Sequence, residues 1–168
     1  AYVDELLPRA TLITPNRAEA ARLLGQDVQG QALDDGATVQ ARAEALVRRY
    51  PQLAVVITGG DAVSASDTLP ASDWLQSPQA SGWLSLPRVD TRHHHGTGCT
   101  FASTAAAALA SGYCVADAVV LAKMATTHAL RHAYAAGQGA GPVCAQSDFA
   151  QHIRNLPALY PALHPALQ

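Results

Sequence analysis

The sequence over residues 90–100 reads Asp90-Thr91-Arg92-His93-His94-His95-Gly96-Thr97-Gly98-Cys99-Thr100. Its Gly-x-Gly turn leads into an apolar run over residues 99–111 that is typical of a helix. The first N–H groups of a helix lack partners within it, and the helix dipole adds partial positive charge there. Because glycine lets the backbone approach a bound anion closely, the stretch predicts an anion-binding turn. The alternative is an ordinary glycine turn in which Thr97 caps the helix.

Upstream of this stretch, apolar runs that are typical of buried strands alternate with runs of helical periodicity. The predicted elements are a helical run over residues 2–7 that Pro8 stops, a strand over 11–14, a helix capped by Asn16, a helix over 38–50, and a strand over 53–58 that Gly59-Gly60 ends. A continuous apolar strand such as the last one is typical of a parallel sheet that is covered on both faces. The alternation predicts an α/β fold with helical crossovers.

The middle of the chain has a different pattern. Residues 61–90 are rich in Ser, Asp, Pro and Gly, with short alternating runs around Trp74 and Trp83. These runs predict an antiparallel hairpin that extends one edge of the sheet. Further on, the sequence predicts a helix over residues 115–136, a flexible glycine loop over 137–142 and a weaker helix over 147–155.

Composition excludes several classes of protein. Of the 168 residues, 49% are hydrophobic and 14% are charged, and the net charge is −2. Such a chain can form a core, and its charge argues against nucleic acid or an anionic membrane as a partner. The longest apolar helical run is too short to span a bilayer. The three cysteines form no CxxC pair, which favours a reducing, cytoplasmic location.

Cys99 and the pair Asn16 and Glu19 are the first candidate site residues. The dipole of a following helix favours the thiolate form of Cys99, which suits a base or nucleophile, whereas the alternative is a small buried residue. Glu19 follows Asn16 at capping-box spacing. The same two side chains would also lie at the carboxyl end of a strand, where they could hold Mg²⁺ through water.

Three consecutive histidines, His93 to His95, raise the possibility of a metal site. Neighbouring residues in regular structure cannot all face one ion, and no acidic or cysteine ligands follow at zinc spacing. A loop packed near the site is therefore favoured. The preceding Asp90 and Thr91 end a predicted strand, where turn capping is the simplest role.

Four motifs together carry a resemblance to a known family. The stretch 90–100 closely resembles the phosphate-binding signature of bacterial hydroxymethylpyrimidine/phosphomethylpyrimidine kinases, which are members of the ribokinase-like superfamily. Residues 14–20, Thr-Pro-Asn-Arg-Ala-Glu-Ala, resemble the Asn-x-x-Glu turn of that family. Residues 57–60 are similar to its Gly-Gly strand end, and residues 139–143 to its C-terminal loop. The order and spacing of the four match across essentially the whole chain.

The resemblance implies a three-layer α/β/α sandwich of the ribokinase type, of which residues 1–168 would form the C-terminal, nucleotide-side part of a single domain. It also implies ATP-dependent phosphorylation of 4-amino-5-hydroxymethyl-2-methylpyrimidine or of its phosphate in thiamine biosynthesis. The family's glycine-rich N-terminal segment is not in this sequence. We therefore expect that roughly the first hundred residues of such a kinase are missing, and that the fragment alone is inactive.

The resemblance also assigns roles to individual residues. The backbone amides of residues 96–99 would form the anion hole for the transferred phosphoryl group, with Cys99 at the position of the family's proposed base. Asn16 and Glu19 would organise Mg²⁺ and its waters. The remaining nucleotide contacts that we expect are Thr58 and Gly60 at the phosphate tail, and Val89 and the helix segment Lys123–Thr127 at the adenine. By analogy with the superfamily, Asp90 and Thr91 would border a monovalent-cation site.

One departure from the family pattern concerns charge: many relatives have lysine where this chain has Thr58, so one cationic contact to phosphate is absent. Two alternatives to a pyrimidine kinase remain open. The chain could come from a kinase of pyridoxal or another small alcohol, or it could be a non-catalytic nucleotide-binding module. Pairing of the strands between Trp74 and Leu86 with a second subunit would give a homodimer.

Overall fold

The computed structural model describes residues 2–26, 35–60 and 70–145. It divides into two compact units, Ala1–Arg88 and Val89–Gln168, which we call the N-terminal and the C-terminal unit. The predicted helix over residues 147–155 lies outside the described residues, as do residues 61–69 of the middle segment. Whether the two units belong to one kinase domain, as the family resemblance implies, stays a prediction.

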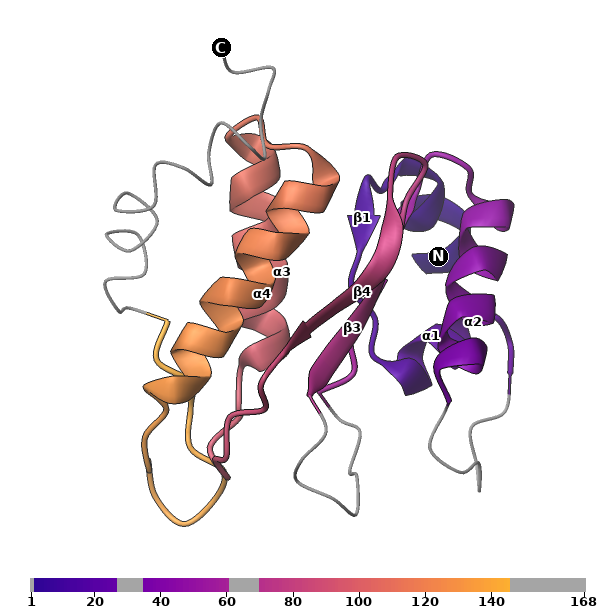
Figure 1. The fold of residues 1–168 in the computed structure, drawn as a ribbon. Coiled ribbons are helices and arrows are strands. Elements are labelled where there is room, and N and C mark those ends of the chain that lie inside the picture. The colour runs from indigo at the N-terminus through magenta and orange to yellow at the C-terminus, as the bar shows by residue number, and fades with distance from the viewer. Residues whose placement is uncertain (1, 27–34, 61–69, 146–168) are drawn as a thin grey trace. The chain divides into compact units, whose positions relative to one another are not determined.

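The N-terminal unit is a mixed sheet with two α-helices (Figure 1). Its strands lie in the order β1-β2-β3-β4, with β1 and β2 parallel and the other neighbours antiparallel. The elements are a π-helix over Tyr2–Leu6, a 3-10 helix over Leu7–Arg9, β1 (Leu12–Ile13), α1 (Arg17–Leu23), α2 (Gly36–Arg49), β2 (Ala54–Ile57), β3 (Ala71–Gln76) and β4 (Ser81–Leu86). The predicted alternation of strands and helices and the predicted hairpin at the sheet edge are confirmed.

The core of this unit lies between the sheet and its helices. Val55 and Ile57 alternate along β2 and pack with Val39 and Leu46 of α2, and all four side chains are at most 1% exposed. Burying aliphatic side chains of this size contributes about 1.5–3 kcal/mol each. All four residues of β2 are buried, as the continuous apolar run predicts.

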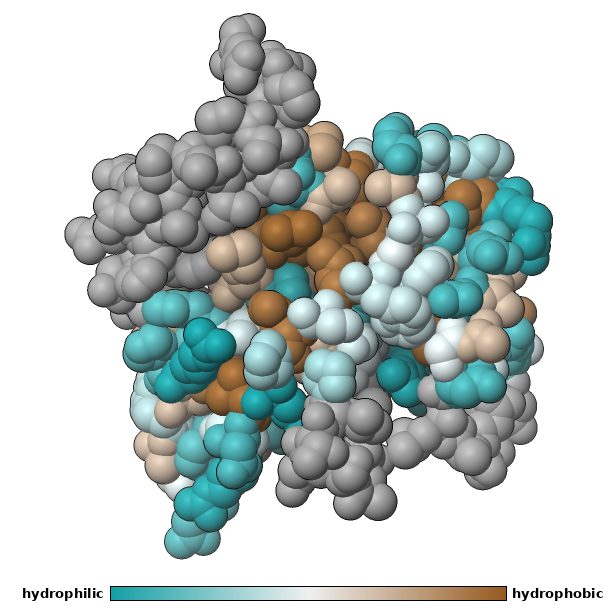
Figure 2. Space-filling view, viewed as in Figure 1, coloured by the Kyte–Doolittle hydropathy of each residue, from teal (hydrophilic) through white to brown (hydrophobic). Residues whose placement is uncertain are grey.

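Helix α2 shows why its sequence forms an amphipathic helix. The Asp35 carboxylate accepts a 2.7 Å hydrogen bond from the Thr38 amide and caps the helix, which therefore begins at Gly36, earlier than predicted. The hydrogen bonds from the Thr38 side chain and amide lower the pKa of Asp35. On the solvent-exposed face of α2, away from the buried residues Val39 and Leu46, Glu44 and Arg48 lie 3.6 Å apart in an i,i+4 ion pair. At the right of Figure 2, where Figure 1 labels α2, much of the surface is coloured teal for hydrophilic residues.

The β3–β4 hairpin is held by pairs of like side chains. Trp74 and Trp83 lie directly opposite each other with ring centroids 5.1 Å apart in an edge-to-face arrangement. The hydroxyl groups of Ser72 and Ser85 are 2.7 Å apart. In the connecting turn, the Ser77 hydroxyl donates to the Ala80 carbonyl and accepts from its amide. Pairing of this hairpin with a second subunit stays a prediction.

The C-terminal unit is a pair of packed helices, α3 (Thr97–Ala110) and α4 (Val115–Arg131), joined by a short turn (Figure 1). Their buried faces consist largely of alanine, including Ala105 and Ala108 of α3 and Ala118 and Ala122 of α4. Small side chains let two helices approach closely. Within the described ranges, no helix has the length and the apolar character needed to cross a bilayer.

Three further predicted helix boundaries are wrong. Pro8 does not stop the first helical run but lies within the 3-10 turn Leu7–Arg9, because proline is tolerated in the first turn of a helix. Helix α3 begins at Thr97 rather than at Cys99. Helix α4 ends at Arg131 rather than at residue 136, since the Tyr134 amide donates to the Pro142 carbonyl and the chain has left the helix.

Candidate functional site

The carboxyl ends of β1 and β2 bring the first group of predicted site residues together. Asn16 and Thr58 form a parallel β-bridge just beyond the two strands, and the Thr58 amide donates a 3.0 Å hydrogen bond to the Pro15 carbonyl. Both side chains are half-buried. Polar groups at the carboxyl edge of parallel strands occupy the position where α/β proteins bind ligands.

Asn16 and Glu19 form a complete capping box at the start of α1. The Asn16 Oδ1 accepts a 2.8 Å hydrogen bond from the Glu19 amide, and the Glu19 Oε2 accepts one of equal length from the Asn16 amide. The structural role weighed in the sequence is therefore confirmed. It leaves the second carboxylate oxygen of Glu19 at an exposed position, so the box does not exclude a role toward a metal ion.

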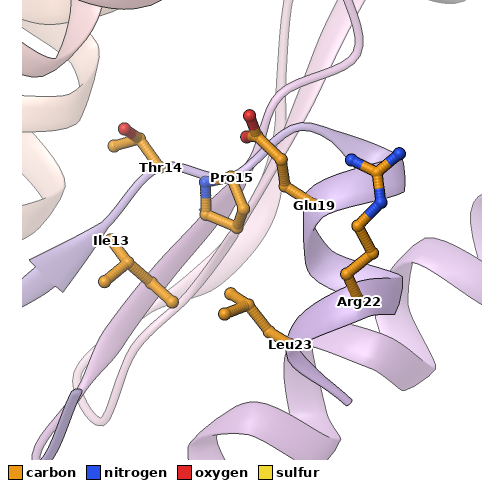
Figure 3. Close-up of a pocket in the computed structure, with 6 residues that line it drawn as sticks. All are labelled: Ile13, Thr14, Pro15, Glu19, Arg22 and Leu23. Atoms are coloured by element: carbon orange, nitrogen blue, oxygen red, sulfur yellow. The ribbon is translucent and has the colours of Figure 1, made fainter. Parts of the chain in front are cut away.

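A cavity of about 420 Å³ lies beside this helix start, lined by Ile13, Thr14, Pro15, Glu19, Arg22 and Leu23. Figure 3 shows Ile13 and Leu23 pointing toward each other across an apolar floor, while the carboxylate of Glu19 and the guanidinium of Arg22 extend from the same face of α1. The cavity thus combines an apolar floor with one charge of each sign.

The Gly59-Gly60 turn at the end of β2 is fixed from several sides. The Gly59 amide donates a buried 2.9 Å hydrogen bond to Oδ1 of Asp73 in β3. A side chain at Gly59 would collide with the Ser72 carbonyl oxygen and would lie 3.2 Å from a guanidinium nitrogen of Arg17. Gly60 is exposed, and its carbonyl accepts a 3.4 Å hydrogen bond from Arg88.

The second group of predicted site residues begins α3. Gly96 has a φ of 90° and precedes the helix without any side-chain cap, so the alternative in which Thr97 caps α3 is wrong. The Thr97 amide makes only a long 3.4 Å bond to the His94 carbonyl. Among the described residues, the amides of Gly98 and Cys99 have no hydrogen-bond acceptor, and both residues are exposed. The turn therefore presents unpaired N–H donors at the positive end of a helix dipole.

The histidine segment before this turn is clasped to the loop that follows α4. The His95 amide donates a 3.1 Å hydrogen bond to the Gly141 carbonyl. The His95 carbonyl accepts a 3.0 Å hydrogen bond from the Val143 amide. The Gly141 amide donates to Nδ1 of His93 over 3.0 Å. Gly141 is buried, so the predicted glycine loop is tied to the rest of the unit at this end.

Metal ligation by these histidines is not supported. In residues 2–26, 35–60 and 70–145, no group of three or more His, Cys, Asp or Glu side chains is placed to hold a metal ion. His93 instead uses a ring nitrogen as an acceptor for a backbone N–H. The favoured interpretation, a packed loop beside the glycine turn, agrees with this arrangement.

The residues predicted to contact adenine or a monovalent cation have no hydrogen bond to the Gly96 turn among those described below. Val89 is half-buried, whereas Lys123 and Thr127 lie 8% exposed on α4, with the Thr127 hydroxyl bonded to the Lys123 carbonyl. The Thr91 hydroxyl accepts a 3.1 Å bond from the His93 amide, which is the turn-capping role expected for it, and Asp90 is exposed. Their ligand roles stay predictions.

Cys114 has a chemical environment that differs from that of a reactive thiol. Partial burial, together with the hydrogen bond that its thiol donates to the Asp117 carboxylate 3.0 Å away, raises the pKa of Cys114. Because the thiolate is the nucleophile, this environment slows alkylation. We expect Asp117→Asn to speed the reaction of Cys114 with iodoacetamide at pH 8 several-fold, measured by mass spectrometry. The rate at Cys144 serves as the control, and an unchanged rate at Cys114 would contradict this assignment.

With both groups described, comparison with known proteins assigns the family. A family model described as phosphomethylpyrimidine kinase matches residues 1–144. This chain belongs to the phosphomethylpyrimidine kinase family. It is 41% identical over 140 residues to the hydroxymethylpyrimidine/phosphomethylpyrimidine kinase of Synechococcus elongatus, covering 83% of this chain and 50% of the relative. It is also 35% identical over 139 residues to the pyridoxine kinase of Bacillus subtilis, covering 83% and 48%.

Solved structures support the same fold. The ADP complex of Bacillus subtilis pyridoxal kinase matches with a TM-score of 0.73 and 32% identity, over 85% of this chain and 51% of that one. The pyridoxal kinase of Staphylococcus aureus in complex with ADP matches with a TM-score of 0.74 and 30% identity, over 84% and 49%. The predicted ribokinase-like α/β fold and the predicted family are confirmed. The chain spans about half the length of the phosphomethylpyrimidine kinases it matches.

Sequence reasoning assigned no role to three residues that shape these two groups. Asp73 bonds to Gly59, Arg17 lies against the same glycine, and Gly141 anchors the histidine segment. The signal for Asp73 was an acidic residue within an otherwise strand-like run. Arg17 and Gly141 lie within two of the family motifs, but their contacts could not be predicted, because the partners are far apart in the sequence.

Proposed function

We propose that the intact gene product transfers the γ-phosphoryl group of ATP to 4-amino-5-hydroxymethyl-2-methylpyrimidine or to its phosphate, in thiamine biosynthesis. The observation that carries the proposal is the uncapped start of α3, where Gly96 adopts a φ of 90° and the amides of Gly98 and Cys99 have no acceptor among the described residues. Membership of the phosphomethylpyrimidine kinase family supports the choice of substrate. Phosphoryl transfer depends mainly on positioning and on charge stabilisation, which such a turn supplies.

In this proposal, the amides of residues 96–99 stabilise the negative charge that develops on the transferred phosphoryl group. Cys99 is exposed in the first turn of α3, where its thiolate can accept the proton of the substrate hydroxyl group. Oxygen of that hydroxyl then forms the new bond to phosphorus, as the bond from phosphorus to the ADP oxygen breaks. The thiol carries the proton away from the reacting centre.

The residues at the start of α1 fit a magnesium ion. Asn16 Oδ1 and Glu19 Oε2 take part in the capping box, which does not use Oε1 of the exposed residue Glu19. Mg²⁺ in nucleotide sites is typically bound by one or two carboxylates, several waters and the phosphates themselves. Bound there, the ion would neutralise charge on the ATP phosphates. Glu19 would orient its waters, and Asn16 would hold Glu19 in place.

Thr58 and Gly60 would line the phosphate tail of ATP from the end of β2. Gly60 is exposed with open space around its Cα, so the backbone can come close to a phosphate. Thr58 offers a neutral hydroxyl, and the guanidinium groups of Arg17 and Arg88 lie beside the same turn. These two guanidinium groups would supply the positive charge near the phosphates that the neutral side chain of Thr58 lacks.

A pyridoxal or pyridoxine kinase is the second candidate. It is favoured by the 35% identity to a pyridoxine kinase and by the structural match to pyridoxal kinases. Both candidates share the phosphate-binding turn and differ in the acceptor alcohol. Assaying ADP formation by the intact gene product with the pyrimidine alcohol, its phosphate and pyridoxal decides between them. A higher kcat/KM with pyridoxal would overturn the pyrimidine assignment.

The role of Glu19 gives a separate prediction. We expect Glu19→Gln to weaken Mg-ATP binding to the intact gene product at least about tenfold, because an amide is a poor ligand for Mg²⁺ and its waters. Calorimetric titration with Mg-ATP and with metal-free ATP measures the effect, and the loss should be confined to Mg-ATP. Glu44→Gln on the exposed face of α2 is the matched control. Equal affinity of the Glu19→Gln and Glu44→Gln variants would contradict a magnesium role.

If the intact wild-type protein binds no nucleotide at all, the kinase proposal fails and a binding or assembly module that does not use nucleotide is the better interpretation. Binding of Mg-ATP without phosphorylation of any of the three acceptors would point to the non-catalytic nucleotide-binding module. The same titration therefore also tests the third possibility that the sequence leaves open.

A further inference from the structure

Asp73 is a buried carboxylate in the middle of a strand. It lies on β3 with 4% of its surface exposed, between the half-buried residues Ser72 and Trp74. Aspartate is depleted in strands, and a buried carboxylate is costly unless it is hydrogen-bonded or paired. A residue kept in such a position calls for a specific partner, and the structure supplies one in Gly59.

The contact between Asp73 and Gly59 continues the β2–β3 pairing by other means. The backbone pairing of these strands runs to Ile57 opposite Trp74. Beyond that pair, Oδ1 of Asp73 accepts a buried 2.9 Å hydrogen bond from the Gly59 amide. The Asp73 side chain therefore supplies a hydrogen bond between the two strands that backbone groups supply elsewhere in the sheet. This bond fixes the first residue of the Gly59-Gly60 turn.

The surroundings of Gly59 leave no room for a side chain at this position. Gly59 lies so close to the Ser72 carbonyl oxygen that a Cβ atom would collide with it. A guanidinium nitrogen of Arg17 lies 3.2 Å from the same Cβ position. The guanidinium of Arg88 reaches the Gly60 carbonyl, 3.4 Å away. The carboxylate of Asp73 thus holds a turn that two cationic groups flank.

We propose that Asp73 is a positioning residue for the nucleotide phosphates, which acts by holding the Gly59-Gly60 turn beside Asn16 and Thr58. The inference rests on the proposed kinase function. Through the Gly59 amide, Asp73 sets the path of the backbone that Thr58 and Gly60 present to ATP. Its role is with ATP rather than with the acceptor alcohol, because its partner lies at the end of β2.

The test separates the hydrogen bond from the charge. Asp73→Ala removes the acceptor, whereas Asp73→Asn keeps an oxygen that can accept from Gly59. In the intact gene product we expect Asp73→Ala to raise KM for Mg-ATP at least about fivefold, the range for losing a buried hydrogen bond. KM for the acceptor alcohol should stay within about twofold. Asp73→Asn should restore KM for Mg-ATP to within about twofold of the wild-type value.

A matched control separates positioning from stability. Asp117→Ala removes another buried carboxylate, 5% exposed on α4, and should destabilise the protein without raising KM for Mg-ATP. Should Asp73→Ala give no folded protein, Asp73→Ser replaces it, since the serine oxygen lies too close to the backbone of β3 to reach Gly59. Its KM for Mg-ATP should rise in the same way.

Two results would overturn the inference. One is an unchanged KM for Mg-ATP in folded Asp73→Ala or Asp73→Ser protein. The other is an equal rise in the asparagine variant, which would mean that charge matters and the hydrogen bond does not. Failure of the proposed function looks different: the wild-type protein itself would then neither bind Mg-ATP nor phosphorylate an acceptor.

Discussion

Under the proposed kinase function, replacing Cys99 by alanine in the intact gene product is expected to lower kcat about 10²–10⁴-fold, the usual loss when a general base is removed. Cys99 lies exposed in the first turn of α3, next to amides that have no acceptor among the described residues. Its thiol is therefore open to a substrate. Binding of Mg-ATP should stay within about twofold of wild type, because the backbone amides of the turn are unchanged.

The measurement is steady-state ADP formation, combined with calorimetry of Mg-ATP binding. Cys114→Ala is the control, since Cys114 is also exposed, but its thiol donates a hydrogen bond to Asp117 and it lies at the N-cap of α4 instead. Its turnover should match that of the wild-type enzyme. Unchanged turnover in Cys99→Ala would identify Cys99 as a residue without a part in proton transfer, and the base would have to be sought elsewhere.

Replacing Gly141 by alanine is expected to destabilise the protein by about 1–3 kcal/mol, as overpacking of a well-packed site does. A Cβ at this position would collide with the Tyr134 carbonyl oxygen and would lie 2.8 Å from Nδ1 of His93. His93 and Gly141 are part of the clasp that holds His95 just before the Gly96 turn, and the Tyr134 amide bonds to the Pro142 carbonyl in the same loop. Displacing the clasp should therefore also lower kcat.

Gly139 offers a close control for this second prediction. It lies in the same loop, two residues earlier, and a Cβ there would meet nothing within 4 Å. Urea unfolding of both variants measures the difference in the free energy of unfolding. Gly139→Ala should lie within about 0.5 kcal/mol of wild type, as exposed substitutions usually do. Equal stability of the two variants would show that the loop moves aside without cost.

The kinds of element could be predicted from sequence because local rules govern them. Apolar runs gave β1 and β2, alternation gave the β3–β4 hairpin, and capping spacing gave the start of α1. The boundaries were harder to predict. Helix α4 ends at Arg131 because Tyr134 bonds to Pro142, and that partner lies outside any local window.

The candidate site divides in the same way. The turn at Gly96 and the pair Asn16 and Glu19 follow from short motifs, because each acts through its own helix start. Asn16 lies beside Thr58 because β1 and β2 pair in a parallel register. The sequence predicted the two strands but not this register. The metal-binding and base roles of these residues stay predictions until the variants above are measured.

By itself, the sequence determined the family, the α/β class, the turn at Gly96 and the helix start at Asn16 and Glu19. All of these depend on residue type and on spacing along the chain. Only the tertiary structure decided that Asp73 holds Gly59 and that Gly141 clasps the histidine segment. The physical reason is that a buried hydrogen-bonding group must find a partner wherever folding brings one within reach. Asp73 and Gly59 come from neighbouring strands of a sheet, and His93 and Gly141 lie before and after a helical hairpin. Neither pair could therefore be predicted from a local sequence pattern.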